Sequence, residues 1–292
     1  MNKKPLDYDF DRLYSEDYTL GQLKKFLLRN IESNDICHWH ERNTFFIDEL
    51  IGKLDLSEDS HYLDLGCNIG TFAIEFSARG KAATGVDLSQ DAIRTAELMA
   101  SYLQLQRSPT FVHGDISDAS VFSENSFDVI IAQDILEHLH DDVLKKTLEN
   151  CFTWLKPGGY FVYQTHPTKY DYLFHSRGWK SLVRLLPLVP SLIHGERKFK
   201  RAVERYHNYI INPVSKFLTG QTREQKIEHD AHCNLLTASE VVTKVEDSGM
   251  VSLFVKTENM YKSDRDKKRA IFFANREYFH RNIYGIAWKP II

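Results

Sequence analysis

From residue 61 onward, short apolar segments alternate along the chain with longer segments in which apolar residues recur at helical spacing. The short segments predict strands, and the longer ones predict helices. This alternation is typical of a parallel β-sheet that helices cover on both faces, and the expected fold class is therefore α/β. The strands are expected at 62–65, 83–87, 110–113, 127–133 and 160–165, and the helices at 70–79, 90–105 and 141–155.

The segments before and after this alternating region have a different pattern of apolar and polar residues. Residues 1–58 are polar and aromatic, with helical spacing at 20–28 and 45–54, and they predict an N-terminal helical cap. Residues 167–236 break the alternation with Tyr, His, Trp and basic residues, which indicates an inserted lid. A helix at 239–247 and strands at 251–257 and 283–288 are expected after it.

Proline and glycine mark where elements end. Pro157, Gly158 and Gly159 are expected to stop the third helix, because proline cannot continue a helix and glycine supplies the positive φ of a turn. A strand should then begin at Tyr160. The chain is accordingly divided into a helical cap (1–58), an α/β core (59–166), a lid (167–236) and a segment that completes the sheet (237–292).

Composition and charge narrow the class of protein. The chain has 292 residues, of which 42% are hydrophobic and 26% charged, as in an ordinary folded soluble protein. Its net charge of −3 gives no overall attraction for nucleic acid. No uncharged apolar run approaches the roughly 18 residues of a membrane span, and no secretory signal is expected. The four cysteines form no Cys-x-x-Cys pair, so we expect reduced thiols and a cytoplasmic protein.

A turn that contains two glycines follows the first strand. It lies in the sequence LDLGCNIG, which spans residues 63–70. Gly66 and Gly70 let the backbone approach a ligand without a Cβ atom, and Asn68 tolerates a positive φ. Asp64 can reach a cationic or amino group at this turn. Such a turn at the mouth of a helix is typical of a nucleotide-like ligand.

Two further acids occupy the ends of the next strands. Asp87 lies 21 residues after Gly66, where a carboxylate can accept both hydroxyls of a ribose. Asp115 can accept from the exocyclic amine of an adenine, and Ile116 can cover one face of the ring. A dinucleotide dehydrogenase is the alternative, but its glycine pattern fails at Asn68 and Thr71.

Together the motifs LDLGCNIG, GVDLS, HGDI, FDVIIAQDILEHL and LKPGGYFV resemble those of class I S-adenosylmethionine (SAM)-dependent methyltransferases over about residues 60–165. The resemblance implies a seven-stranded sheet whose last strand is antiparallel. Asn68 departs from the commoner glycine at its position. Arg42 is a further candidate, as a bidentate partner of the cofactor carboxylate. The other cofactor contacts that the resemblance implies are Asp64, Gly66, Asn68, Gly70, Asp87, Leu88, Asp115, Ile116 and, behind the sulfonium, Gln133.

Acidic and imidazole side chains gather after the fourth strand. Asp134, Glu137 and His138 share one face if this segment is helical. Two carboxylates and an imidazole suit Mg²⁺, Mn²⁺ or Zn²⁺, and the triplet resembles the metal-binding acid-x-x-Glu-His of the ubiquinone-biosynthesis O-methyltransferases. Two alternatives remain: Glu137 and His138 orient the local helix, or His138 acts as a general base without metal. His166, at the end of the fifth strand, and His232, just before Leu235, are expected to face the acceptor side, and His166 is a further catalytic candidate.

Methyl transfer from a sulfonium is an in-line displacement that mainly requires alignment, and a base or metal helps when the acceptor is a hydroxyl. We therefore expect O-methylation of a small molecule such as a phenol or catechol. The alternatives are N- or C-methylation of a natural product or sugar, methylation of nucleic acid, and a non-catalytic cofactor-binding module. Nucleic acid is disfavoured because no Asn/Asp-Pro-Pro-Tyr motif follows the fourth strand.

The acceptor pocket is expected to come from the cap and the lid. Residues 170–206 combine an apolar, proline-broken stretch with five basic residues and two acidic ones at 194–206. This combination predicts either peripheral contact with an anionic membrane or a lid whose apolar face covers the active site. The sequence gives no indication of oligomeric state.

Overall fold

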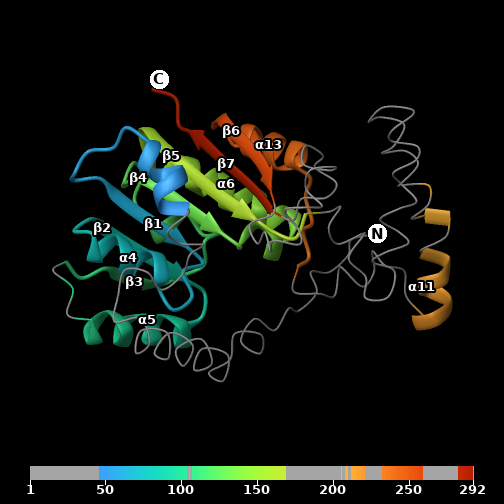
Figure 1. Cartoon of the computed structure of the whole chain (residues 1–292), viewed down its shortest axis with the longest axis horizontal. Coiled ribbons are helices and arrows are strands. Elements are labelled where there is room, and N and C mark those ends of the chain that lie inside the picture. Colours follow the sequence, from blue (N-terminus) through green and yellow to red (C-terminus); the bar gives the residue numbers. More distant parts are fainter. Residues whose placement is uncertain are drawn as a thin grey trace, which may run out of the picture.

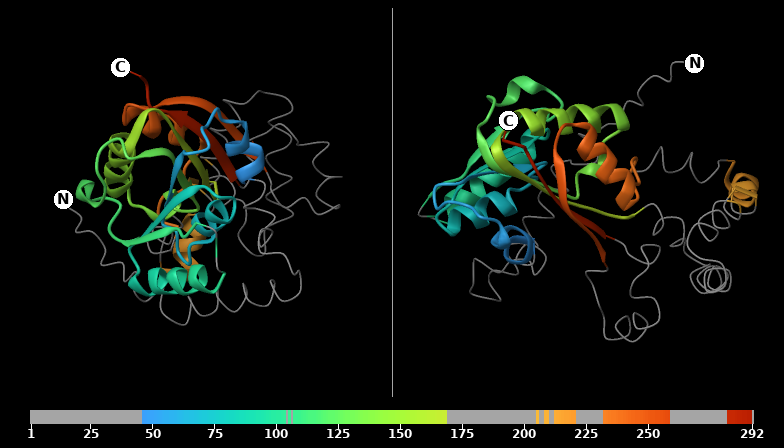
Figure 2. Two further views of the ribbon diagram at one scale, coloured as in Figure 1. Left: turned by 90° about the vertical axis from the view of Figure 1, so that its left-hand side faces the viewer. Right: turned by 90° about the horizontal axis from the view of Figure 1, so that it is seen from above.

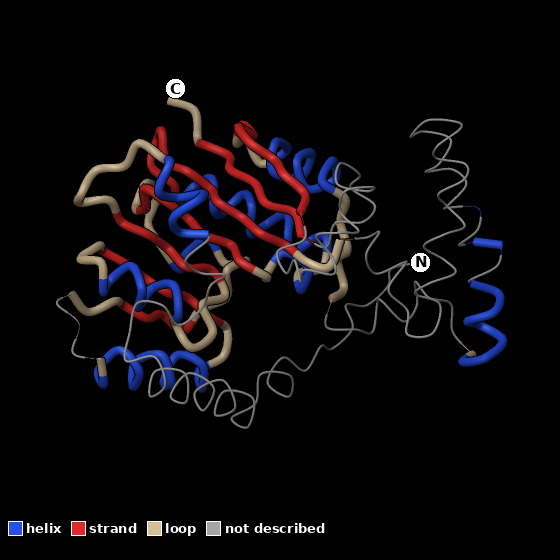
Figure 3. The backbone as a smooth tube through the Cα atoms, viewed as in Figure 1, coloured by secondary structure: helices blue, strands red, loops and turns tan. Residues whose placement is uncertain are grey.

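The computed structural model describes residues 46–103, 105, 107–168, 205, 208–209, 212–220, 232–258 and 282–291 (Figure 1). Within these residues, strands and helices follow one another as the alternating pattern predicts, and Figure 3 shows the strands as one sheet flanked by helices. Most of the expected cap and lid, including Arg42 and all of 170–206 except Arg205, lies outside the described residues.

The strands are β1 (His61–Leu65), β2 (Ala82–Asp87), β3 (Thr110–His113), β4 (Phe127–Gln133), β5 (Leu155–Thr165), β6 (Val251–Glu258) and β7 (Asn282–Trp288). The helices are α4 (Thr71–Ala78), α5 (Gln90–Tyr102), α6 (Asp141–Trp154), α11 (Asn212–Thr219) and α13 (Ala238–Asp247). The shorter turns are η2 (Phe46–Leu50), η3 (Ile51–Lys53), η4 (Ala119–Val121) and η5 (Leu136–His138).

The described strands form one seven-stranded sheet in the order β3-β2-β1-β4-β5-β7-β6. The pairs β3/β2, β2/β1, β1/β4 and β4/β5 are parallel, and β7 runs antiparallel to both β5 and β6. This confirms the mostly parallel sheet with an antiparallel last strand. The strand order reverses direction between β1 and β4, and ligands of open α/β sheets bind at such a switch point beside the carboxyl ends of the strands.

Helices cover both faces of the sheet, as the two turned views in Figure 2 show. On one face, Leu63, Ile130 and Phe161 belong to the same buried cluster as Leu148 of α6 and Val245 of α13. The other face carries a second buried cluster, which joins strand residues to η2 and α4: Tyr62, Phe72, Phe76, Val129, Ile131 and Val162. Alternate residues of each central strand are therefore buried on opposite faces, as two-sided coverage of a parallel sheet requires.

Two local predictions differ from the structure. The segment at 45–54, expected as one helix, forms the π-helical turn η2 and then the 3₁₀ turn η3. Gly52 lies within this second turn, and glycine has a low intrinsic helix propensity. The helix expected at 90–105 ends earlier, at Tyr102.

The turn expected at Pro157–Gly159 is accommodated within β5, so the prediction that the strand restarts at Tyr160 is wrong. Strand β5 begins at Leu155, directly after α6, and Leu155 pairs with Phe127 of β4. The register shifts between Phe127 and Val129 and so leaves room for the extra residues. Gly158 has a φ of 81°, and a Cβ atom on Gly159 would lie 3.0 Å from the Asp128 carbonyl oxygen.

Among the described helices, none has both the length and the apolar character needed to cross a lipid bilayer.

Candidate functional site

The parallel strands β1 to β5 all end at one edge of the sheet, and the candidate residues follow these ends directly. Gly66 follows β1, Leu88 follows β2, and Asp134 follows β4. Because β1 and β4 are neighbours, the glycine turn and the acid–imidazole segment lie on adjacent strands. The sheet therefore brings together two groups of side chains that the sequence separates.

The turn after β1 has the backbone conformation that its sequence predicts. Gly66, Asn68 and Gly70 have φ values of 61°, 50° and 77°, in the left-handed region. A Cβ atom on Gly66 would lie 2.7 Å from Ile135 Cδ1, and one on Gly70 would lie 2.5 Å from Phe111 Cε1. Both glycines are thus required by the chain's own packing as well as by any ligand that approaches the turn.

Asp87 connects the glycine turn to the end of β2. Its Oδ2 accepts a hydrogen bond from the Asn68 backbone N–H at 2.8 Å, and its Oδ1 accepts one from the Ser89 N–H at 2.8 Å. Burial raises the pKa of Asp87, and these two donors partly offset that effect. Each carboxylate oxygen can accept more than one hydrogen bond, so Asp87 can both hold the turn and accept the two hydroxyls of a ribose.

Asp64 is a buried carboxyl beneath the same turn, with 5% of its surface exposed. Its Oδ2 has no hydrogen-bond partner. Burial raises its pKa to about 8, the Ala73 N–H lowers it in part, and the charge of Asp87 raises it further. A cationic group next to Asp64 would therefore favour its ionised form.

The adenine candidates lie after β3. Asp115 Oδ1 accepts a hydrogen bond from the Ser117 N–H at 2.8 Å, and Ile116 is nearly buried. Leu88, beside Asp87, is 48% exposed at the same edge. Gln133 ends β4, where it pairs with Gln164 of β5. These residues occupy the positions expected from the sequence, and their contacts to a cofactor remain predictions.

The acid–imidazole residues form a compact cluster after β4 and β5. Asp134 has a φ of 50°, which is uncommon for a residue other than glycine. In this conformation its Oδ1 lies 2.7 Å from His166 Nδ1. When His166 donates this hydrogen bond from Nδ1, its Nε2 is left as an acceptor.

Glu137 is the buried centre of the cluster, with no exposed surface. Its Oε2 accepts a hydrogen bond from the Thr165 hydroxyl at 2.8 Å, and its Oε1 has no hydrogen-bond partner. Burial would raise the pKa of Glu137, but His166, whose Nδ1 lies 3.6 Å from Oε1, and the charge of His138 lower it below its usual value. Glu137 is thus a buried carboxylate whose Oε1 accepts no hydrogen bond and lies 3.6 Å from His166 Nδ1.

The structure does not place the predicted triplet on one helical face. Only Leu136–His138 is helical, as the 3₁₀ turn η5, and Asp134 precedes it in a left-handed conformation. Within the described chain, two groups could hold a metal, each with its donor atoms within 4.8 Å of one another. They share Glu137: one adds His138 and His232, and the other adds Asp134 and His166.

His232 and Thr165 are members of this site that the sequence motifs do not include. The rings of His138 and His232 lie 4.9 Å apart between centroids, and those of His166 and His232 lie 6.2 Å apart. The only local signal for His232 is its position just before the helix expected at 239–247, from which the sequence predicts that it faces the acceptor side. Its pairing with His138 requires the folded chain.

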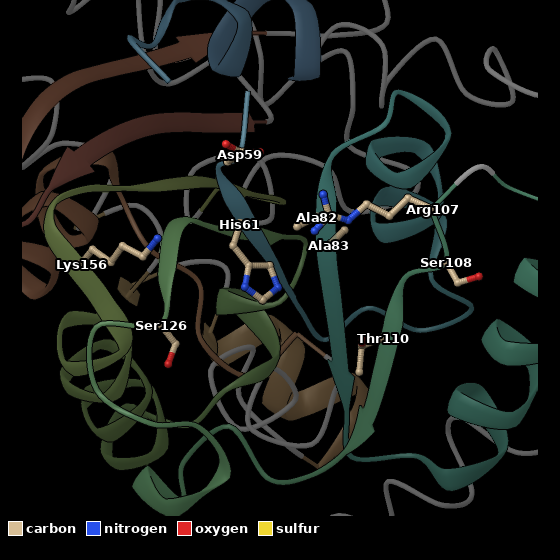
Figure 4. Close-up of a pocket in the computed structure, with 9 residues that line it drawn as sticks. All are labelled: Asp59, His61, Ala82, Ala83, Arg107, Ser108, Thr110, Ser126 and Lys156. Atoms are coloured by element: carbon tan, nitrogen blue, oxygen red, sulfur yellow. The ribbon is translucent and has the colours of Figure 1, made fainter. Parts of the chain in front are cut away.

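A separate cleft of about 480 Å³ lies at the opposite, amino edge of the sheet (Figure 4). In Figure 4, His61 lies between Lys156 and Arg107. His61 Nε2 is 2.9 Å from the Thr84 hydroxyl, and Lys156 pairs with Asp128 at 2.7 Å. None of the candidate cofactor or catalytic residues lines this cleft.

Comparisons with known proteins identify a family and relatives that this chain resembles. A family described as "Methyltransferase domain" matches residues 63–159. A ubiquinone biosynthesis O-methyltransferase from Vibrio vulnificus is 28% identical over 166 residues, which are 56% of this chain and 68% of that protein.

Solved structures share the fold. A SAM-dependent methyltransferase from Methanosarcina mazei superposes with a TM-score of 0.51 at 22% identity, over 81% of this chain and 95% of that one. The magnesium protoporphyrin IX methyltransferase of Synechocystis, with bound SAH, gives a TM-score of 0.50 at 14% identity, over 85% of this chain and 82% of that one. These similarities show that the chain shares the fold of these methyltransferases.

Proposed function

This chain belongs to the class I SAM-dependent methyltransferases, and we propose that it transfers the methyl group to a hydroxyl oxygen of a small molecule such as a phenol or catechol. One observation carries the proposal. The acid–imidazole cluster of Asp134, Glu137, His138 and His166 follows β4, which is the neighbour of β1 and its glycine turn, and β5, which is the next strand of the sheet. A hydroxyl acceptor gains from such groups, whereas a neutral amine needs none of them.

The chain's own residues have distinct roles in this proposal. The glycine turn, Asp64, Asp87 and Asp115 hold the cofactor and fix its sulfonium at the carboxyl edge. Asp134 holds His166 by the 2.7 Å hydrogen bond, so that the ring keeps one orientation. Held in this way, His166 can use Nε2 as the base that takes the hydroxyl proton of the small-molecule substrate. The transfer itself is an in-line displacement that depends on alignment of oxygen, methyl and sulfur.

We further propose that a divalent cation binds at this cluster. The donor set fits a divalent cation. Glu137 has a buried oxygen that accepts no hydrogen bond, and the donor atoms of Glu137, His138 and His232 lie within 4.8 Å of one another. Mixed carboxylate and imidazole donors suit Mn²⁺ or Zn²⁺, and Mg²⁺ with retained water. When bound, the cation would lower the pKa of a hydroxyl beside it. In the alternative without metal, His138 or His166 alone serves as the base.

An acceptor screen tests the proposed reaction. Catechols, other phenols, hydroxy lipids, sugars and amines are incubated with SAM, with EDTA or with added Mg²⁺, Mn²⁺ or Zn²⁺, and methylated product is measured. We expect turnover of a phenolic or catecholic hydroxyl that is lost in EDTA and restored by metal. Turnover that EDTA does not affect would support base catalysis instead. Turnover of amines or carbon acceptors only would contradict O-methylation and favour the alternative of N- or C-methylation.

The chain's location and its partners are also proposals. The Vibrio vulnificus relative is named as an O-methyltransferase of ubiquinone biosynthesis, which is compatible with the small-molecule hydroxyl acceptor proposed here. We propose a cytoplasmic enzyme without a nucleic-acid partner. Peripheral membrane contact through 170–206 stays a prediction, because nearly all of that segment lies outside the described residues.

Asp64 makes cofactor binding depend on pH in a defined direction. Its pKa of about 8 means that the free enzyme holds this carboxyl mostly protonated at pH 7, and the cofactor's ammonium group would favour the ionised form. Binding should therefore release a proton below pH 8, and affinity should rise with pH until the free carboxyl is itself ionised. Calorimetry at pH 7 in two buffers of different ionisation enthalpy measures this proton release.

The matched variant is Asp64→Asn, which preserves the shape of the side chain and cannot ionise. The cofactor's own amine titrates in the same range, but that contribution is common to both proteins and cancels in their difference. We expect the variant to bind more weakly and to release less proton than wild type. Equal proton release by both proteins would show that Asp64 does not meet the ammonium group.

A further inference from the structure

The segment that carries His232 is fastened to the turn around η5. The Asn234 backbone N–H donates to the Glu137 carbonyl oxygen at 2.9 Å. The Asn234 side-chain amide donates to the Leu139 carbonyl oxygen at 3.0 Å and to Asp141 Oδ1 at 3.2 Å. Cys233 Sγ donates to the His138 carbonyl oxygen at 3.2 Å. Residues from distant parts of the chain are thereby held side by side.

Asn234 is the central residue of this attachment. It is 8% exposed, so its amide makes its hydrogen bonds largely away from water. The chain then enters α13 through a capping box, in which Thr237 and Glu240 satisfy each other's backbone N–H groups. The segment 233–237 is therefore attached at both ends, and His232, whose ring lies 4.9 Å from that of His138, directly precedes this attachment.

The two possible donor groups differ in what a cation would have to displace. In the group of Asp134, Glu137 and His166, the His166 Nδ1 already lies at 2.7 Å from Asp134. A cation ligated there by Nδ1 would have to break this hydrogen bond. The Glu137 oxygen that accepts no hydrogen bond belongs to both groups, so it does not distinguish them. Ligation by Glu137, His138 and His232 leaves the hydrogen bond between His166 and Asp134 intact.

We propose that His232 is a third protein ligand of the cation site, together with Glu137 and His138, and that Asn234 is the residue that positions it. The proposal rests on the cation proposed above and specifies which side chains hold it. It makes the site depend on two parts of the chain, because 95 residues separate Cys233 from His138. His166 then stays free of the cation and keeps its hydrogen bond with Asp134.

Cation binding by the full chain without SAM separates this role from turnover. Calorimetry with Mn²⁺ or Zn²⁺ and absorption spectroscopy with Co²⁺ are applied to wild type, His232→Gln, His166→Gln and Asn234→Ala. We expect one cation per wild-type chain, and an affinity about 10-fold lower in Asn234→Ala, as for a residue that orients a ligand. His232→Gln should lose more affinity than that and should shift the Co²⁺ spectrum, while His166→Gln should do neither.

Control variants keep the result interpretable if a substitution perturbs folding. Thr237→Ala removes the cap of α13 in the same segment and leaves the cluster intact, and His61→Gln removes a histidine at the opposite edge of the sheet. Both should keep wild-type cation affinity even where the melting temperature falls. Asn234→Asp provides a second test of the positioning role, because it retains a side-chain acceptor but loses the amide donor.

Wild-type affinity in His232→Gln, or a loss confined to His166→Gln, would overturn the assignment in favour of the other donor group. No cation binding by wild type would also overturn it. The acceptor screen in EDTA separates that failure from failure of the proposed function, because methyl transfer without metal would leave O-methylation standing.

Discussion

Replacing Asp87 with alanine should abolish useful cofactor binding. Hydrogen bonds to a charged acceptor contribute about 1.5–3 kcal/mol each, so loss of both ribose contacts should weaken SAM binding at least about 100-fold. The same carboxylate also holds the Asn68 N–H of the glycine turn, which adds to the effect. Calorimetric titration with SAM or S-adenosylhomocysteine measures the change.

Asp118→Ala is a matched control for this prediction. Asp118 also accepts a hydrogen bond from a backbone N–H, because its Oδ1 accepts from the Ser120 N–H at 2.9 Å as the cap of η4, but it is not among the expected cofactor contacts. We expect it to keep near wild-type affinity. Unchanged SAM affinity in Asp87→Ala would show that the ribose is bound elsewhere, and melting curves of both variants exclude general unfolding as the cause.

The cofactor half of the site was predictable because each of its signals is local. Asp87 is the last residue of β2, and the glycine turn directly follows β1, so a strand prediction alone places both at the carboxyl edge. Asn68 has the positive φ that its residue type predicts. The role of Gly85 is not local: a Cβ atom there would lie 2.8 Å from Cys67 Sγ across the neighbouring strand.

The other half of the site was only partly predictable, because its members meet through the fold. The motif around Asp134 and His138 is contiguous, whereas 32 residues separate Asp134 from His166. The spacing of Asp134, Glu137 and His138 would place them on one face of a helix, but Asp134 has a left-handed backbone and its carboxylate lies against His166. His232 has no motif and depends on the hydrogen bonds of Asn234, which no pattern in the sequence indicates.

Glu137→Gln should reduce turnover far more than cofactor affinity. The glutamine keeps the shape of the buried side chain and can still accept from the Thr165 hydroxyl, but it carries no charge. Removal of a group that supports proton transfer at a hydroxyl costs about 100-fold or more in kcat. We expect that loss together with a change in SAM affinity below about threefold, because Glu137 is not among the residues expected to contact the cofactor. Glu137→Ala should show the same separation with a larger loss of stability, since it leaves the Thr165 hydroxyl buried without its acceptor.

The pH dependence of unfolding gives an independent readout. The pKa of Glu137 is lowered in the folded state, so its ionised form stabilises the fold above the unfolded-state pKa, and that contribution is lost as the pH falls through the folded value. Glu137→Gln should therefore lose less stability than wild type when the pH is lowered across this range. Glu75→Gln is the matched control, because Glu75 is also a buried carboxylate, on α4, but it pairs at 2.7 Å with Arg79, which directly follows that helix. It should alter the melting temperature and leave kcat unchanged. Equal losses of kcat and SAM affinity in Glu137→Gln would place Glu137 with the cofactor and remove the cluster from the acceptor side.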